Sequence, residues 1–277
     1  MLHNVEKQDC YVQHLMNMPQ RFGLTISEDV RNLQGAILVP KGGQFDKDVA
    51  EKIGHHQLMQ PLGSCVQLNN QLLAKQLNGY FKKIFLIYPD LAMMNERWQL
   101  KELLLSSCEY FQRFPIIIQK MTVLKERLPY IFNQSLFCAY MSLAIAKRMG
   151  VTKEDCKAVF LAGLIHDIGI LHLDADLLMQ KGDYTPQQWR AMHSHTVIAH
   201  NELSQVKNFP AKISLAVLEH HERFDGSGYP HAKQDSQLGM MGQIVGMGRA
   251  LRIPDVDRVV DRFDELSGQL VFQRILR

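Results

Sequence analysis

The chain has 277 residues, of which 46% are hydrophobic and 21% charged, as in a globular protein with a substantial core. Its formal net charge is +3 and no long Lys/Arg run appears, so neither a DNA-binding nor a membrane-surface function is indicated. Five scattered cysteines, no signal-peptide pattern at residues 1–7 and no apolar stretch of membrane-spanning length together predict a cytoplasmic protein with reduced thiols.

Residues 1–70 are predicted to form a small α/β accessory module. The apolar run 36–39 closes on a Pro-Lys-Gly-Gly turn, which is typical of a strand entering a turn. Asp46 is placed to cap a helix over residues 47–53. Residues 62–68 are predicted to supply a further strand.

Residues 71–277 are predicted to be almost wholly helical, because apolar residues recur there at helical spacing. One helix is expected over 133–150, and Thr152 is a good N-cap for the next. Thr185 begins another with Pro at its first position and a Gln that completes a capping box. A further helix is expected from Ala211.

Histidines fall on these predicted helices: His166 at the C-terminal end of one, His195 about two turns into the helix from Thr185, and His220 along one face of the helix from Ala211. A His-Asp-Ile-Gly motif begins at His166, a lone His195 follows, and the run from His220 to Pro230 reads His-His-Glu-Arg-Phe-Asp-Gly-Ser-Gly-Tyr-Pro. Neutral imidazoles beside a carboxylate are the usual ligands of Fe, Mn or Zn at hydrolytic centres. The pattern therefore predicts a metal-dependent phosphoester site. Four other histidines near these motifs are expected to lie on the surface or behind the ligands: His172, His193, His200 and His231.

In their order and separations, the motifs over residues 134–249 resemble the HD-GYP domain, a branch of the HD superfamily of metal-dependent phosphohydrolases. The resemblance implies a mainly α protein, a helical HD-domain bundle preceded by the small α/β module. It also implies cyclic di-GMP as the nucleotide, an iron or manganese centre of two or three metals, and contacts with diguanylate cyclase-type domains.

The resemblance also assigns roles residue by residue. Metal ligands would be His166, Asp167, His195, His220 and His221, with His166 and Asp167 central to catalysis and Asp167 bridging two metals. The nucleotide pocket would be lined by a loop whose tyrosine offers a face for stacking, namely Gly226, Ser227, Gly228, Tyr229 and Pro230.

Three positions depart from the family pattern. A histidine ligand is replaced by Gln134, an aspartate ligand by Arg249, and the lysine after His-Asp-Ile-Gly by Ile170. An amide is a poor ligand for a transition metal, and a guanidinium has no lone pair to give. The glutamate of trinuclear members falls near Tyr130, so a third metal also lacks a ligand.

The replaced ligands belong mainly to one of the two metal sites. One site keeps only His166 and the shared Asp167, whereas the other keeps a full set of Asp167, His195, His220 and His221. We therefore expect one metal rather than two, or none, and a degenerate signalling protein with weak or no hydrolysis that acts by binding a nucleotide or a partner.

Several alternatives stay open. The protein could be an active cyclic di-GMP phosphodiesterase that recruits Asp255 or Asp257, another HD-superfamily phosphohydrolase with one metal, or a scaffold. Arg249 could pair with Asp167 as a built-in cation, or extend to solvent.

Overall fold

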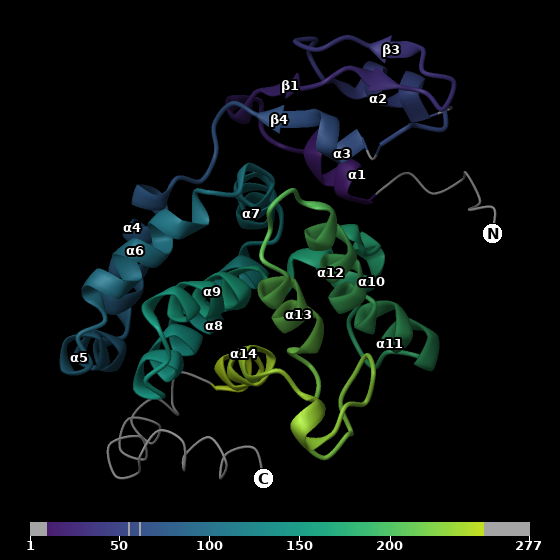
Figure 1. The fold of residues 1–277 in the computed structure, drawn as a ribbon. Coiled ribbons are helices and arrows are strands. Elements are labelled where there is room, and N and C mark those ends of the chain that lie inside the picture. The colour runs from purple at the N-terminus through teal and green to yellow at the C-terminus, as the bar shows by residue number, and fades with distance from the viewer. Residues whose placement is uncertain (1–9, 55, 61, 252–277) are drawn as a thin grey trace.

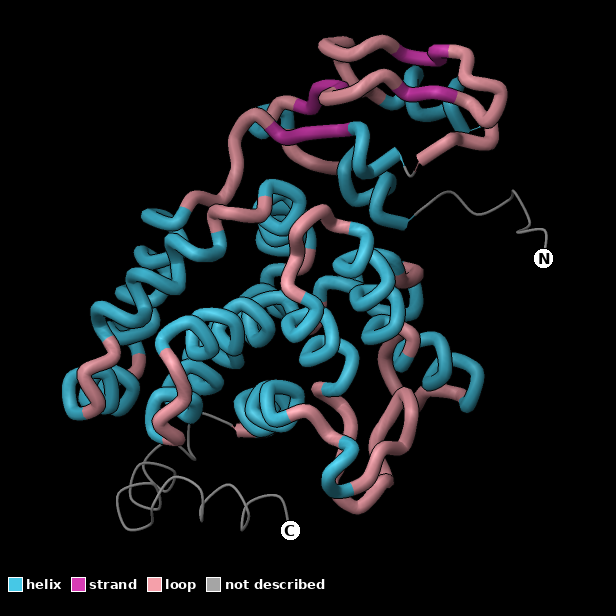
Figure 2. The backbone as a smooth tube through the Cα atoms, viewed as in Figure 1, coloured by secondary structure: helices cyan, strands magenta, loops and turns pink. Residues whose placement is uncertain are grey.

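The computed structural model describes residues 10–54, 56–60 and 62–251 (Figure 1). A small module with short strands lies at one end, and a larger helical bundle forms the rest of the described chain. The tube in Figure 2 shows that all the strands lie in the module and that the bundle consists of helices and loops. The protein is thus mainly α, with a small α/β module before the helical domain, as predicted.

The module combines short helices with paired strands. Its elements are α1 (Cys10–Met16), η1 (Gln20–Phe22), β1 (Leu24–Ile26), β2 (Val30–Arg31), β3 (Ile37–Val39), α2 (Lys47–Gly54), α3 (Leu62–Cys65) and β4 (Val66–Leu68). Strands β1 and β4 pair antiparallel with Leu24 opposite Leu68, and β2 and β3 pair antiparallel with Val30 opposite Val39.

Two of the three predicted elements of the module are confirmed. Strand β3 falls on the predicted run, and α2 begins where Asp46 caps it, its Oδ1 accepting a hydrogen bond from the backbone of Val49 at 2.9 Å. The strand predicted over 62–68 is wrong in its first half, which forms α3. A helical turn there buries both Leu62 and Cys65, three residues apart on one face, whereas alternation along a strand would separate them.

The bundle begins at α4 and, within the described residues, contains α-helices of 5 to 20 residues and two short 3₁₀ helices. They are α4 (Ala74–Ile87), α5 (Pro89–Arg97), α6 (Lys101–Phe111), α7 (Pro115–Arg127), α8 (Pro129–Arg148), α9 (Lys153–Ile165), η2 (Ile168–His172), α10 (Ala175–Met179), α11 (Pro186–His193), α12 (His195–Gln205), α13 (Ala211–Glu219), η3 (Asp235–Gln237) and α14 (Met240–Ala250).

Helix α8 is the centre of the bundle, packed against α9 on one side and α14 on another. Glycines allow these close approaches: a Cβ on Gly163 of α9 would lie 3.0 Å from the Cα of Ala139, and one on Gly248 of α14 would lie 3.0 Å from the Cys138 carbonyl oxygen. Helix α8 begins earlier than predicted because Pro129 takes its first position, where a missing N–H costs nothing.

The predicted helix starts in the second half of the bundle are confirmed. Thr152 accepts a hydrogen bond from the backbone of Asp155 at 3.1 Å, and Thr185 and Gln188 form the expected reciprocal capping box. Helix α13 begins at Ala211. The helix that begins after Thr185 ends at His193, however, so His195 begins a separate helix, α12, and does not lie within the predicted one.

One continuous hydrophobic core runs from the module into the bundle, since buried residues from Tyr11 to Met247 belong to a single cluster. A polar cluster joins the two parts. The Nζ of Lys120 on α7 lies 2.9 Å from both carboxylate oxygens of Glu202, 2.8 Å from Nε2 of His172 and 4.1 Å from the ring centroid of Tyr11 in α1. The Lys120 side chain is only 7% exposed, so its charge depends on these partners.

Replacing Lys120 by methionine is expected to lower the free energy of unfolding by about 3 kcal/mol, the low end for breaking a buried pair because Glu202 remains partly exposed. Burial opposes ionisation of Glu202, but His172 and Lys120 outweigh it and lower the pKa of its carboxyl. In the wild type, the stabilisation that comes from ionised Glu202 should thus be fully present above its unfolded-state pKa of about 4.3. It should be lost as the pH falls through the lower pKa that Glu202 has in the folded state. Denaturant unfolding at several pH values measures both effects.

Two further variants control this experiment. Lys101→Met on α6 removes an exposed lysine and should change stability by less than about 0.5 kcal/mol. Lys120→Met combined with Glu202→Leu removes the stranded carboxylate as well and should recover part of the loss. Equal unfolding free energies for Lys120→Met and Lys101→Met would contradict the expectation.

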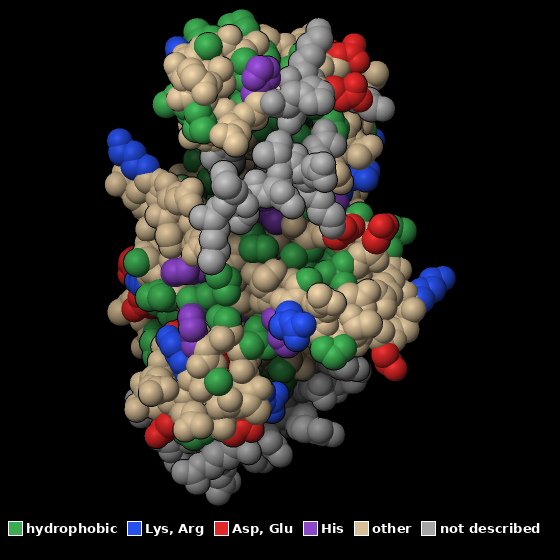
Figure 3. All heavy atoms as spheres, turned by 90° about the vertical axis from the view of Figure 1, so that its right-hand side faces the viewer, with side chains coloured by type: hydrophobic (Ala, Val, Ile, Leu, Met, Phe, Trp, Pro, Cys, Tyr) green, Lys and Arg blue, Asp and Glu red, His purple; other side chains and the backbone are tan. Residues whose placement is uncertain are grey.

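None of the helices in the described part of the chain is both long and apolar enough to cross a membrane. On the face of the molecule shown in Figure 3, lysine and arginine side chains are scattered and form no continuous basic band. This distribution agrees with the small net charge of +3.

Candidate metal centre

Asp167 lies at the centre of a buried histidine cluster. Its Oδ2 is 3.0 Å from Nε2 of His166, and its Oδ1 is 3.3 Å from Nε2 of His195 and 3.6 Å from Nε2 of His220. Each imidazole comes from a helix end: His166 follows α9, His195 begins α12 and His220 follows α13. Helix ends far apart in sequence thus converge on one carboxylate.

The same backbone contact orients all three of these imidazoles. Nδ1 of each ring lies within hydrogen-bond distance of the carbonyl oxygen three residues earlier, at 2.8 Å for His166, 2.6 Å for His195 and 2.6 Å for His220. A carbonyl oxygen can only accept, so Nδ1 must carry the proton. In the neutral ring, Nε2 then presents a lone pair toward Asp167, the tautomer that a metal ligand needs.

The Nε2 nitrogens of two of these rings have no hydrogen-bond partner among the described residues. Nε2 of His195 and Nε2 of His220 are buried without a hydrogen-bond partner. Both face the Asp167 carboxylate, which when ionised has only lone pairs to offer. Buried lone pairs that face one another are unfavourable unless a cation lies between them, so this arrangement fits a bound metal ion.

His221 completes a set of four ligand groups. One ligand atom from each of Asp167, His195, His220 and His221 can be chosen so that all four lie within 4.8 Å of one another. Ligands about 2.1 Å from a metal are roughly 3–4 Å apart, so only a small contraction is required. Three imidazoles and a carboxylate suit Fe or Mn. The structure therefore brings together the four residues that the sequence assigned to one metal.

The protonation states of the four ligand groups agree with metal binding. Burial lowers the pKa of His220 to about 3, and burial with the nearby His220 and Arg249 lowers the pKa of His221. Burial opposes charge on His166 and Asp167, but their mutual attraction outweighs it, so the pKa of His166 is raised and that of Asp167 lowered. Among the four ligand groups, His220 and His221 are thus neutral and Asp167 is ionised, whereas His166 is held in its protonated form by Asp167.

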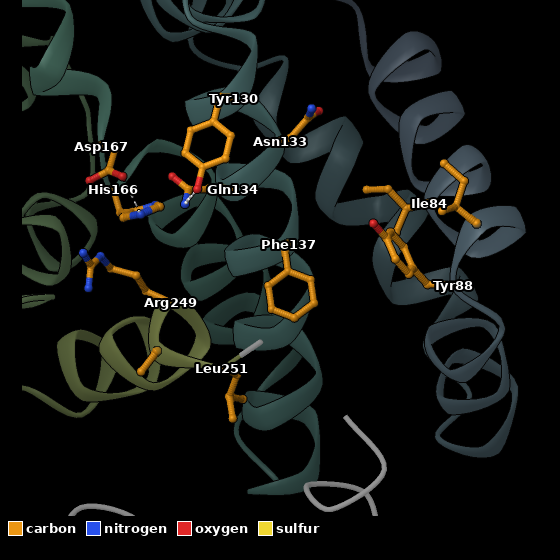
Figure 4. Close-up of a pocket in the computed structure, with 12 residues that line it drawn as sticks. Ile84, Tyr88, Tyr130, Asn133, Gln134, Phe137, His166, Asp167, Arg249 and Leu251 are labelled. Carbon is orange, nitrogen blue, oxygen red and sulfur yellow. Dashed lines mark hydrogen bonds and ion pairs between the residues drawn. The ribbon is translucent and has the colours of Figure 1, made fainter. Parts of the chain in front are cut away.

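A cavity of about 730 Å³ borders the cluster, with His166 and Asp167 in its lining (Figure 4). Its described lining also includes rings and aliphatic side chains on α4, α8 and the residues that follow α4 and α14, among them Tyr88, Phe137 and Leu251. The size is within the usual range for small-molecule sites.

The two replaced ligand positions both line this cavity. Gln134 on α8 and Arg249 on α14 extend toward the side where His166 and Asp167 lie, and the Gln134 amide donates a hydrogen bond to the hydroxyl of Tyr130 at 3.1 Å. Arg249 is exposed and forms no ion pair with Asp167 among the described residues. The direct Arg249–Asp167 pair considered from the sequence is therefore not formed.

The Gly226–Pro230 loop does not line this cavity. None of its residues is among the described lining of the cavity. Tyr229 has both ring faces covered, by His193 at 3.7 Å and by His221 at 4.3 Å between ring centroids. Histidine rings thus occupy both faces of Tyr229, and its contact with a nucleotide stays a prediction of the resemblance.

The other assigned positions have local explanations. Ile170 is buried with Leu173 and Leu177 in a small apolar cluster, where a lysine ammonium would have no partner. His200 places Nδ1 3.1 Å from the Ser214 carbonyl oxygen. Asp255 and Asp257 lie outside the described residues.

Sequence reasoning missed two residues of this region. The sequence predicts His193 only as a surface or supporting histidine, whereas it stacks on Tyr229, and it gives no indication of the buried Lys120. His193 lies two positions before His195, and that proximity was the only available signal. Lys120 had none, since its partner Glu202 is 82 positions away.

Comparison with known proteins places these residues in a family context. Residues 91–252, more than half of the chain, match the model of the HD domain. A 3'3'-cGAMP-specific phosphodiesterase of Vibrio cholerae is 30% identical over 125 residues, which are 45% of this chain and 29% of that protein. A cyclic di-GMP phosphodiesterase of Thermotoga maritima is 31% identical over 109 residues, 39% of this chain and 30% of that protein.

These matches span less than a third of each relative's own length. A solved HDG"Y"P protein from Bdellovibrio bacteriovorus aligns with 88% of this chain and 90% of its own, with 11% identity and a TM-score of 0.44.

Proposed function

This chain belongs to the HD domain family, and we propose that it is an HD-GYP-type bacterial signalling protein that binds a cyclic dinucleotide beside one metal ion and hydrolyses it weakly or not at all. The asymmetry around Asp167 carries the proposal. Asp167 lies among His195, His220 and His221, and two of their nitrogens have no hydrogen-bond partner among the described residues. Gln134 and Arg249 line the cavity that His166 and Asp167 also line, and they cannot replace a histidine and an aspartate as ligands.

The single metal would be held by Asp167, His195, His220 and His221. A divalent ion there supplies Lewis acidity, polarising a phosphoryl oxygen and balancing its charge. The chain's own contribution is orientation: backbone carbonyls fix the rings of His195 and His220, and His166 holds the second oxygen of Asp167 at 3.0 Å. A pair of metals would need further donors in place of Gln134 and Arg249.

The cavity supports the nucleotide part of the proposal. Arg249 supplies a permanent cation for a phosphate, and Gln134 supplies amide groups that donate or accept. Tyr88 and Phe137 supply aromatic surface for a base. The relatives named above act on 3'3'-cGAMP or cyclic di-GMP, which gives the ligand class. A contact between the Gly226–Pro230 loop and a diguanylate cyclase-type domain stays a prediction of the resemblance.

Calorimetric titration of the purified protein with cyclic di-GMP and 3'3'-cGAMP tests this function. We expect saturable binding of one of them, weakened about 10-fold or more in Arg249→Met, because a hydrogen bond to a charged group contributes about 1.5–3 kcal/mol. Arg190→Met removes an exposed arginine on α11, away from the cavity lining, and should leave binding unchanged.

Product analysis by chromatography completes the test. Intact nucleotide after long incubation, together with saturable binding, supports the proposal. Rapid release of linear dinucleotide or GMP would instead establish an active phosphodiesterase, and no binding of either nucleotide would rule out the proposed ligand.

A further inference from the structure

Three aromatic rings stack in series beside the metal-ligand cluster. The rings of His193 and Tyr229 are 3.7 Å apart with planes at 10°, and those of Tyr229 and His221 are 4.3 Å apart with planes at 21°. His195 closes a further side, with its ring edge-on to His221 at 5.1 Å. The His221 ring therefore lies between Tyr229 and the other ligands of the cluster.

His221 differs from the other histidines of the cluster in how it is held. His166, His195 and His220 each place Nδ1 against a backbone carbonyl oxygen, whereas no hydrogen bond to the His221 ring is formed within the described ranges 10–54, 56–60 and 62–251. An imidazole without such an anchor can rotate about its side-chain bonds. The flat face of Tyr229, at 4.3 Å between ring centroids, restricts that rotation together with the His220 ring at 4.2 Å.

Backbone contacts of the Gly226–Pro230 loop hold Tyr229 against His221. The Tyr229 N–H donates to the His221 carbonyl oxygen at 3.2 Å. The Glu222 carboxylate accepts from the backbone N–H groups of His231 at 2.6 Å and Lys233 at 2.9 Å, which ties the far side of the loop to the end of α13. A Cβ on Gly228 would lie 2.5 Å from the His221 carbonyl oxygen, so only glycine permits this approach.

We infer that Tyr229, backed by His193, is a positioning residue for His221 and takes the place of the missing carbonyl anchor. The inference rests on the proposed function, in that His221 must be a metal ligand for its orientation to matter. The Gly228–Pro230 segment then holds one metal ligand, His221, in place. A nucleobase has no access to either face of Tyr229 while the stack is intact.

The test is a titration of the full chain with Co²⁺, followed by visible absorption, which reports both affinity and the ligand environment of the ion. Tyr229→Leu keeps an apolar side chain but removes the flat ring, and Tyr229→Phe keeps the ring without the hydroxyl. We expect Tyr229→Leu to bind Co²⁺ about 10- to 100-fold more weakly, as for losses of other ligand-supporting groups, and Tyr229→Phe to bind like the wild type.

A second pair of variants keeps the test independent of the folding of Tyr229→Leu, which thermal unfolding would check. His193 is only partly buried, so His193→Leu and His193→Phe should both fold. His193→Leu should weaken Co²⁺ binding, in the same direction as Tyr229→Leu, and His193→Phe should preserve it. Weakening in both would mean that the His193 nitrogens themselves bind the ion, which would overturn the positioning role of the stack.

The outcomes also separate this inference from the proposed function. Wild-type Co²⁺ binding with equal affinity in Tyr229→Leu would overturn the positioning role and leave the metal site standing. Loss of nucleotide binding in Tyr229→Leu with unchanged Co²⁺ affinity would restore the base-stacking role and overturn the inference. No Co²⁺ binding by the wild type would overturn both.

Discussion

Replacing His220 by alanine is expected to leave the purified protein with almost no metal, whereas the wild type should carry about one divalent ion per chain. The reason is geometric: Nε2 of His220 is buried, has no hydrogen-bond partner, and is held toward Asp167 by the Val217 carbonyl. Since losing a mere supporting group costs about 10- to 100-fold in affinity, losing a ligand should cost more than about 100-fold. Elemental analysis of protein purified without oxygen measures this.

Two further variants make the metal measurement specific for the proposed ligands. Asp167→Asn keeps the shape of the side chain but removes its charge, so it tests the ligand set without leaving a cavity, and it should also lose the metal. His231→Ala changes an exposed histidine outside the cluster and should retain wild-type metal. Wild-type metal content in His220→Ala would show that the ion binds elsewhere.

Gln134→His combined with Arg249→Asp is expected to raise the metal content from about one to about two ions per chain. Both positions line the cavity that also exposes His166 and Asp167, so the new imidazole and carboxylate would face the unused side of Asp167. Turnover of the cyclic dinucleotide should rise at least about 100-fold, because a metal ion supplies several kcal/mol of charge stabilisation in the transition state.

The matched control places the new histidine one position away. Asn133 lines the same cavity on α8, so Asn133→His with Arg249→Asp introduces the same residue types out of register. That variant and each single substitution should stay near one metal and show no rise in turnover. A metal content unchanged by the Gln134→His/Arg249→Asp pair would mean that these two residues do not stand at vacated ligand positions.

The sequence by itself determined much of the local structure and the identity of the site residues. Thr152 and Thr185 fix helix starts through side-chain bonds to residues three positions away, so short-range patterns suffice to locate them. The histidines of the cluster were identified by motif order, but the break between α11 and α12 that puts His195 at a helix start was not predicted. The strand predicted over 62–68 failed because contacts with the core, which local alternation does not encode, favoured the helical turn α3.

Only the tertiary structure decided how the residues meet. That Asp167 faces two buried nitrogens without partners depends on the packing of α9, α12 and α13, which are separate in sequence. The covering of both faces of Tyr229, and the enclosure of Lys120 by a residue 82 positions away, likewise arise from close contacts between distant segments. Sequence spacing fixes which groups share a helix end, whereas the three-dimensional packing of the helices fixes which lone pairs, rings and charges come within bonding distance.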